Sequence, residues 1–177
     1  MPVEFTISYL ADAQAILRQY KQMGDRAMQQ VTDEQLFATL SGEANSIAIT
    51  VKHMAGNMRS RWTDFLTTDG EKPDRYRDSE FVDPPATRAA LIETWEAGWA
   101  LVFGALAGLS DLDLGRTVLI RGEKHSVMQA INRQLAHYAS HVGQIVLLAK
   151  HFAGERWQSL SIPKGKSAEF LPRPAQK

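Results

Sequence analysis

The sequence predicts an all-α protein folded as a four-helix bundle, and three observations lead to this fold class. Apolar residues recur at helical spacing in four long windows of the 177-residue chain. Repeated β-branched runs with the period of two that strands need are not found. The segment 68–85, rich in Asp, Gly, Pro and Arg, predicts a long connection between the second and third helices.

The first two helices are expected before residue 67. The first ends near 28–30, and a short turn follows at Thr32, a helix N-cap residue with acidic neighbours. The second is expected over about 45–66. On the first helix the predicted apolar face consists of Phe5, Tyr9, Ala13, Ile16, Tyr20 and Met23, and on the second of Ile47, Val51, Met54, Met58, Trp62 and Phe65.

The third and fourth helices lie beyond the long connection. Bundles normally use shorter loops, so this connection is expected to cross over the top of the bundle or to cover something. The third helix follows Pro85, and the fourth runs from a Ser126 cap to about Phe152, with Gly154 as terminator. Between them, residues 117–120 suggest a short strand or an extended loop. The third helix is expected to bury Ile92, Trp95, Trp99, Val102, Leu106 and Leu109.

Length predicts one domain. Residues 1–155 form the bundle, and residues 156–177 form a C-terminal tail that packs on or beside it. Because the tail contains Pro163, Pro172 and Pro174, it cannot be a fifth long helix.

Composition narrows the function. Lys and Arg number 20 and Asp and Glu number 20, so no net field attracts nucleic acid or an anionic membrane. The absence of cysteine excludes disulfides, thiolate metal sites and a cysteine nucleophile, so any metal must bind nitrogen and oxygen. The sequence begins without a signal-peptide pattern, and no stretch approaches the apolar length of a membrane span. We expect a cytoplasmic protein that binds neither nucleic acid nor membrane.

His137 and His141 are four residues apart, so both project from one face of the fourth helix and can chelate one ion. Alone, the pair is weak evidence, since five histidines give an accidental pair of this spacing with odds of about one in ten. His53 strengthens the evidence for a metal site. With Ser46, Thr50 and Asn57, His53 forms a polar stripe beside the apolar stripe of the second helix, as expected for the lining of a pocket between helices.

These three histidines predict one divalent transition metal, zinc or nickel, with an open coordination position for water or substrate. Asn57 and Gln144 are candidates for orienting a ligand or touching substrate, or are simply polar helix surface. His125, in the loop before the fourth helix, is a further candidate. The basic residues Arg59, Arg61, Lys72, Arg75 and Arg77 form either a solvated face or an anion-binding rim.

The sequence lacks the residues that three familiar functional motifs require. The stretch His-Tyr-Ala-Ser-His lacks the glutamate of the zinc-protease helix. No Glu-x-x-His occurs, which argues against a ferritin-like di-iron site. A Gly-Lys-Ser triplet begins at Gly165, but Leu160 stands where a phosphate loop needs glycine.

A histidine on the second helix followed by a His-x-x-x-His pair on the fourth resembles the DinB-like superfamily. Segments 46–73 (SIAITVKHMAGNMRSRWTDFLTTDGEKP), 125–151 (HSVMQAINRQLAHYASHVGQIVLLAKH) and 157–170 (WQSLSIPKGKSAEF) look like an uncharacterised bacterial subgroup of it. The likeness covers nearly the whole chain and is loose in the first and third helices. It implies a four-helix bundle with an unusual connection between its second and third helices, a metal on the three matching histidines and a homodimer.

Characterised members of the superfamily include metal-dependent transferases and isomerases that use low-molecular-weight thiols, so the resemblance implies a small-molecule substrate of this kind. We expect a metal-dependent transferase or hydrolase in which the ion activates a thiol or water. No general acid or base stands out, since Asp64 is the only carboxylate in line with the His53 stripe. The alternative is a noncatalytic stress or interaction protein. Trp95 and Trp99 are the residues expected to contribute most to a dimer interface.

Overall fold

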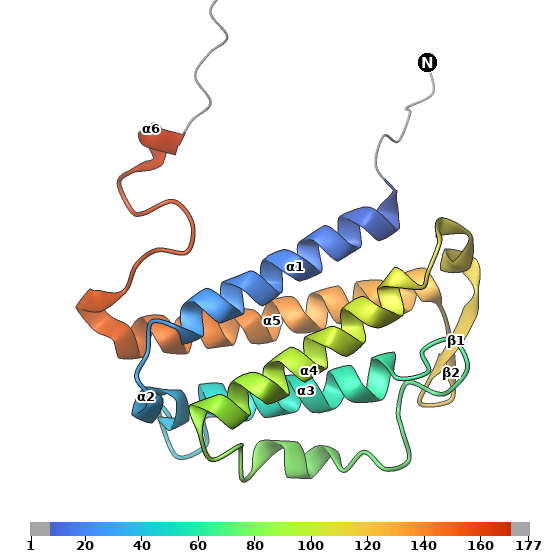
Figure 1. The fold of residues 1–177 in the computed structure, drawn as a ribbon, viewed down its shortest axis with the longest axis horizontal. Helices are drawn as coiled ribbons and strands as arrows, with labels where there is room; N and C mark the ends of the chain where they lie inside the picture. Colours follow the sequence, from blue (N-terminus) through green and yellow to red (C-terminus); the bar gives the residue numbers. More distant parts are fainter. Residues whose placement is uncertain (1–7, 171–177) are drawn as a thin grey trace, which may run out of the picture.

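The computed structural model describes residues 8–170, in which the chain is mostly helical with one small two-stranded sheet. Its four long helices are α1 (Tyr9–Met28), α3 (Ile47–Trp62), α4 (Arg88–Ala107) and α5 (Val127–Ala153). They lie side by side (Figure 1), with α3 packed against α4 and α5, and α1 packed against α5 and α4. The predicted all-α class is confirmed.

Hydroxyl side chains begin the four long helices. Ser8, Ser46, Thr87 and Ser126 each accept a hydrogen bond from the backbone N–H three residues later. The short helix α2 (Asp33–Phe37) begins at Thr32 with a capping box to Gln35, at the predicted turn. The end of α5 is also where the sequence predicts it, because Gly154 adopts a φ of 57°.

Two details of the helices differ from the predictions. α3 ends at Trp62 rather than near residue 66, because Thr63 is extended and Asp64 has a φ of 48°. On α1 the buried face is shifted by about one residue, to Leu10, Ala13, Leu17, Gly24, Ala27 and Met28. Both faces carry apolar residues at helical spacing, so packing decides between them. Phe5, predicted on the other face, lies outside the described residues.

Trp95 and Trp99 are buried in the core of one chain, with 1% and 0% of their surface exposed. Trp95 donates a hydrogen bond to the carboxylate of Asp25 at 2.6 Å and lies over Gly24, where an added Cβ would come within 2.7 Å of its ring. The prediction that these two tryptophans contribute most to a dimer interface is therefore wrong, since they already pack against other helices of the same chain.

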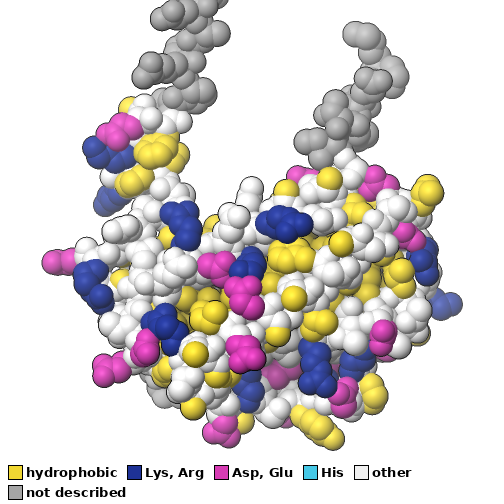
Figure 2. Space-filling model, viewed as in Figure 1, with side chains coloured by type: hydrophobic (Ala, Val, Ile, Leu, Met, Phe, Trp, Pro, Cys, Tyr) yellow, Lys and Arg dark blue, Asp and Glu magenta, His cyan; other side chains and the backbone are white. Residues whose placement is uncertain are grey.

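α4 is long and apolar enough to cross a membrane by length and composition, contrary to the sequence prediction, and it is the one such helix in residues 8–170. This is weak evidence, because the core helix of a soluble protein passes the same test. Leu91, Trp95 and Val102 of α4 lie in the core, although only 33% of the apolar stretch is buried. Figure 2 shows apolar side chains also gathered on the outer face over α1 and α4.

A β-hairpin precedes α5. Strands β1 (Thr117–Ile120) and β2 (Glu123–Ser126) pair antiparallel, with Thr117 opposite Ser126, and follow the 3₁₀ turn η2 (Asp111–Gly115). β1 confirms the strand predicted at 117–120, and alternate residues Val118 and Ile120 face the core. The turn between the strands has positive φ at Arg121 and Gly122.

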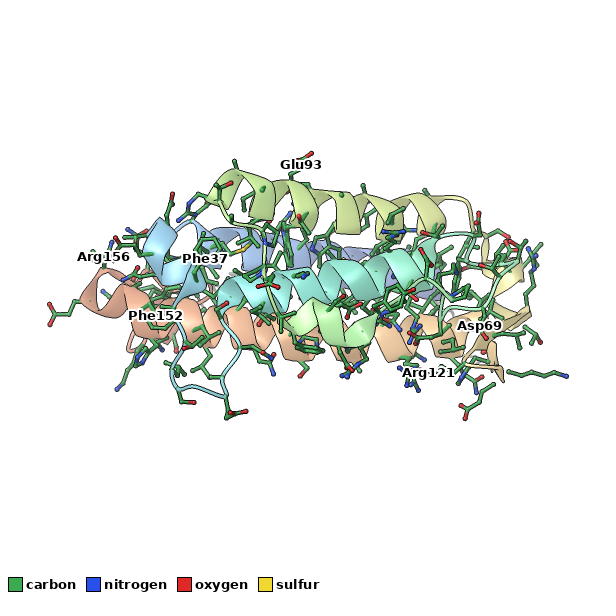
Figure 3. The ribbon with its side chains drawn as sticks, turned by 90° about the horizontal axis from the view of Figure 1, so that it is seen from below. Phe37, Asp69, Glu93, Arg121, Phe152 and Arg156 are labelled. Carbon is green, nitrogen blue, oxygen red and sulfur yellow. The ribbon has the colours of Figure 1, made fainter. Side chains whose placement is uncertain are left out.

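The connection between α3 and α4 contains the 3₁₀ helix η1 (Arg77–Phe81), which packs along α3. Figure 3, seen from below, shows this segment in front of α3, with α4 above and α5 beneath. The expected long connection therefore exists, and it covers one side of the helix that carries His53.

Residues beyond α5 form the 3₁₀ turn η3 (Gly154–Arg156), an irregular segment and the short helix α6 (Ser167–Phe170). Trp157 and Leu160 pack against the core, while Gln158 exchanges hydrogen bonds with Gln30, just beyond the end of α1. Residues 161–170 are exposed, and the last seven residues of the predicted tail lie outside the described residues.

Candidate metal centre

Three histidine side chains converge between α3 and α5. One ring nitrogen of each of His53, His137 and His141 lies within 4.8 Å of the others. The Nε2 atoms of His137 and His141 are 3.1 Å apart. Two ligands held about 2.0–2.1 Å from one tetrahedral ion are separated by about 3.3 Å, so the pair fits a shared ion. The three residues predicted as metal ligands lie together.

Helix geometry explains the convergence. His137 and His141 are one turn apart on α5, and their ring centroids are 4.6 Å apart. α3 packs against α5, so that the centroid of the His53 ring lies 5.5 Å from that of His137 and 4.8 Å from that of His141. From the connection, the ring of Phe81 stacks on His53 at 4.6 Å. His53 is thus enclosed, with 4% of its surface exposed.

Burial keeps two of the rings in the form that binds metal. It lowers the pKa of His137 to about 3, assisted by the nearby His141 and His53. Burial also lowers the pKa of His141, although the hydrogen bond to Gln144 acts in the opposite direction. Both rings are therefore neutral near pH 7 and retain a lone pair for an ion.

Hydrogen bonds outside the cluster hold two of the rings by Nδ1. The carboxylate of Glu80 lies 2.8 Å from His53 Nδ1, and the side-chain oxygen of Gln144 lies 2.8 Å from His141 Nδ1. His137 Nδ1 is buried without a hydrogen-bond partner in the described part of the chain. Since His137 and His141 face each other through Nε2, an all-nitrogen donor set fits a divalent transition metal.

Glu80 and its partner Arg75 both come from the connection between α3 and α4. Arg75 holds the two carboxylate oxygens of Glu80 at 2.7 and 2.9 Å. Burial alone would raise the pKa of Glu80, but the hydrogen bonds with His53 and Arg75 outweigh it and lower the pKa. Glu80 is therefore a buried carboxylate between one arginine and one candidate ligand.

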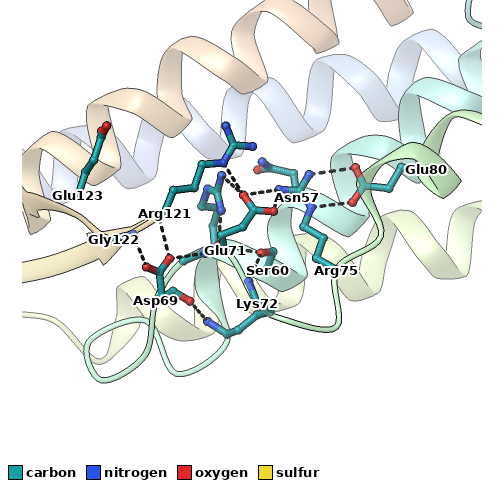
Figure 4. A network of polar contacts seen from close by, with 12 residues as sticks. Asn57, Ser60, Asp69, Glu71, Lys72, Arg75, Glu80, Arg121, Gly122 and Glu123 are labelled. Carbon is teal, nitrogen blue, oxygen red and sulfur yellow. Dashed lines mark hydrogen bonds and ion pairs between the residues drawn. The ribbon is translucent and has the colours of Figure 1, made fainter.

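The pair belongs to a longer polar network (Figure 4). Glu71 contacts Arg75 at 3.3 Å, Arg61 at 3.0 Å and Arg121 of the hairpin turn at 2.9 Å. The carboxylate of Asp69 accepts the backbone N–H groups of Arg121 and Gly122 at 2.8 and 2.7 Å. The network thus ties the β-hairpin to the connection that holds Glu80.

Sequence reasoning missed Glu80, Arg75 and Phe81 as neighbours of the candidate ligands. They lie in a segment without helical periodicity, and the unusual length of that segment was the only signal. The basic residues near His53 also need correction. The side chains of Arg61 and Arg75 are 6% and 5% exposed and ion-paired, so these two do not belong to a solvated face, although Arg75 also lines a cavity beside α3.

The four other residues considered from the sequence occupy different places. Gln144 touches His141 directly. Asn57 is buried one turn beyond His53, where its side-chain oxygen accepts a hydrogen bond from the Tyr138 hydroxyl at 3.2 Å, and no hydrogen bond joins it to a candidate ligand. His125 lies on β2 outside the cluster, with Glu123 at 3.8 Å as its nearest acidic group. Asp64 is exposed beyond the end of α3.

A cavity of about 540 Å³ lies between α3, the connection and α4. The Glu80 side chain belongs to both the cavity and the histidine cluster, since it lines the cavity and contacts His53. None of the three clustered histidines lines the cavity. It is therefore a neighbour of the histidine cluster, separated from it by the Glu80 side chain and α3.

A family model described as a protein of unknown function, DUF1572, matches residues 4–166. The chain belongs to this family. The match includes the four long helices, the connection and all three clustered histidines. No curated protein matches the chain.

Proposed function

We propose that this DUF1572 protein is a metal-dependent enzyme that holds one divalent ion, zinc or nickel, on His53, His137 and His141. The observation that carries the proposal is the convergence of these three imidazoles. Within residues 8–170, the cluster contains no fourth histidine or acidic ligand. Structural zinc sites are closed by four protein ligands, whereas catalytic sites use three and leave one position for water or substrate.

The chain's own residues prepare the centre in three ways. Burial keeps His137 and His141 neutral, Phe81 covers His53, and Glu80 and Gln144 hold two rings by Nδ1. When bound, a divalent ion in such a site lowers the pKa of a thiol or water and supplies a nucleophile near neutral pH. The low-dielectric wall of α3 and α5 strengthens that electrostatic effect.

We further propose that the protein is a DinB-like four-helix bundle acting on a small molecule, possessing the thiol S-transferase chemistry of some members of that superfamily. The order of the histidines, one on α3 and a pair on α5, supports this. The family resemblance also supports a cytoplasmic homodimer, and the apolar side chains exposed over α1 and α4 offer surface for one.

One observation favours a second candidate, a noncatalytic stress or interaction protein that keeps the metal. Both oxygens of Glu80, the carboxylate nearest the cluster, are already bound by Arg75 and His53. A general base needs a free oxygen within hydrogen-bond reach of the proton it removes. The enzyme proposal therefore depends on the ion itself activating the nucleophile.

A conjugation screen separates the two candidates. Protein loaded with zinc or nickel is incubated with low-molecular-weight thiols and electrophilic substrates, and loss of free thiol is followed. We expect turnover that disappears on chelation, returns on adding the metal and is absent in His141→Ala. A metal-loaded protein that consumes no thiol and hydrolyses no activated ester would favour the noncatalytic candidate.

A further inference from the structure

Glu80 is the one carboxylate among the described residues that hydrogen-bonds a ring of the cluster. Its side chain is 8% exposed, and it comes from η1, far from the candidate ligands in sequence. An added Cβ on Gly56 would lie 2.5 Å from Glu80 Oε1, so the lack of a side chain on α3 lets the carboxylate approach this closely. The position of η1 in the connection and the missing side chain at Gly56 of α3 therefore both fix the place of the Glu80 carboxylate.

We propose that Glu80, clamped by Arg75, is a positioning residue that fixes the tautomer and orientation of His53 so that Nε2 faces the metal. The inference rests on the metal site of the proposed function and adds an anchored carboxylate to it. Sequence spacing does not reveal this residue, and its contact with His53 is visible only in the fold.

The tautomer follows from donors and acceptors. A carboxylate only accepts hydrogen bonds, so the 2.8 Å contact requires the proton on His53 Nδ1. In the neutral ring, the Nε2 lone pair is then free and points away from Glu80. In water a neutral histidine prefers the proton on Nε2, the form that would block an ion there, so Glu80 selects the form that binds metal.

Arg75 prevents Glu80 from turning away. Its guanidinium holds both oxygens in a two-point contact, leaving Oε2 aimed at His53. Phe81, the next residue, stacks on the His53 ring and restrains its rotation. Glu80 and Phe81 thus fix the ring from its edge and from its face.

The corresponding contact on His141 differs in charge and in exposure. Gln144 offers a neutral amide oxygen on the exposed side of α5. A buried anion raises the basicity of the imidazole it contacts and offsets the charge of a bound cation more than an amide does. We therefore expect His53 to depend on Glu80 more strongly than His141 depends on Gln144.

The first experiment reads the tautomer without metal. The full-length protein with ¹⁵N-labelled histidine is studied by NMR in chelator, at a pH about two units above the usual histidine pKa of ~6.5. We expect His53 to carry its proton on Nδ1 in the wild type and to lose this preference in Glu80→Ala. A wild-type His53 protonated on Nε2 overturns the proposal, and this result needs no variant to fold.

The second experiment measures Zn²⁺ affinity by competition with a chromogenic chelator. We expect Glu80→Gln to weaken binding about 10- to 100-fold, the usual effect of removing such a partner. Gln144→Ala should weaken it less. Glu71→Gln is the matched control, because Glu71 contacts Arg75 but no histidine, and its affinity should stay within about 3-fold.

The outcomes separate this inference from the proposed function. Equal losses in Glu80→Gln and Glu71→Gln, or unchanged affinity in Glu80→Gln, overturn the positioning role while the metal site stands. A wild type that binds no Zn²⁺ or Ni²⁺ overturns the metal site, and the tautomer measurement then decides whether Glu80 still orients His53.

Discussion

Replacing His53 or His141 with alanine is expected to abolish tight binding of a divalent ion while leaving the helices folded. Each substitution removes one of three nitrogens, and two imidazoles chelate an ion much less tightly than three. The free energy of unfolding should change by only about 1–2 kcal/mol, because a buried polar group is lost together with some packing. The metal-free wild type should also stay helical, since apolar side chains form the core.

The measurement is paired: metal content by mass spectrometry and thermal unfolding by circular dichroism. His151→Ala is the control, because His151 is exposed near the end of α5, outside the cluster, and this variant should keep the wild-type metal content. Loss of helical signal in the metal-free wild type would show that the ion is structural, which contradicts the catalytic interpretation.

Trp99→Ala is expected to cost the most stability of the substitutions considered, about 3–5 kcal/mol. Its ring is fully buried and lies 5.5 Å from Trp95, 5.5 Å from Phe103 and 5.6 Å from Tyr138. Alanine would leave a cavity between the rings of Trp95, Phe103 and Tyr138. Tyr138 adjoins His137, so loosening this contact should also weaken metal binding.

Urea unfolding of wild type, Trp99→Ala and Trp99→Phe tests this expectation. Phenylalanine retains most of the apolar contact and removes an indole N–H that has no hydrogen-bond partner among the described residues. Trp99→Phe should therefore lower the free energy of unfolding by much less than Trp99→Ala does. Similar losses of about 1 kcal/mol or less for both variants would contradict the central place of Trp99 in the core.

Much of the fold could be predicted from the sequence because its signals are local. Helical spacing identifies the four long helices, and Ser126 and Gly154 mark the ends of α5. Which face of α1 is buried could not be read in this way, because Tyr9 and Leu10 each begin an apolar row. Only the packing of α4 and α5 against α1 selects the row of Leu10.

The candidate site likewise has one part that could be predicted from the sequence and one part that could not. His137 and His141 share a helical face by spacing alone, and the polar stripe around His53 indicates which way that ring points. Glu80 reaches His53 from 27 residues away through an irregular segment, so no periodic pattern relates the two. The expectation that Trp95 and Trp99 contribute to a dimer interface failed because an apolar helix face does not reveal which neighbour covers it.

X-ray absorption at the metal edge of the purified full-length protein tests the central claim most directly. The account predicts one ion per chain, bound by three imidazole nitrogens at about 2.0–2.1 Å with at least one further light-atom ligand from solvent. In His53→Ala the imidazole count should fall. A wild-type protein that binds no stoichiometric metal, or binds it without histidine nitrogen, would contradict the assignment of His53, His137 and His141 as a metal centre.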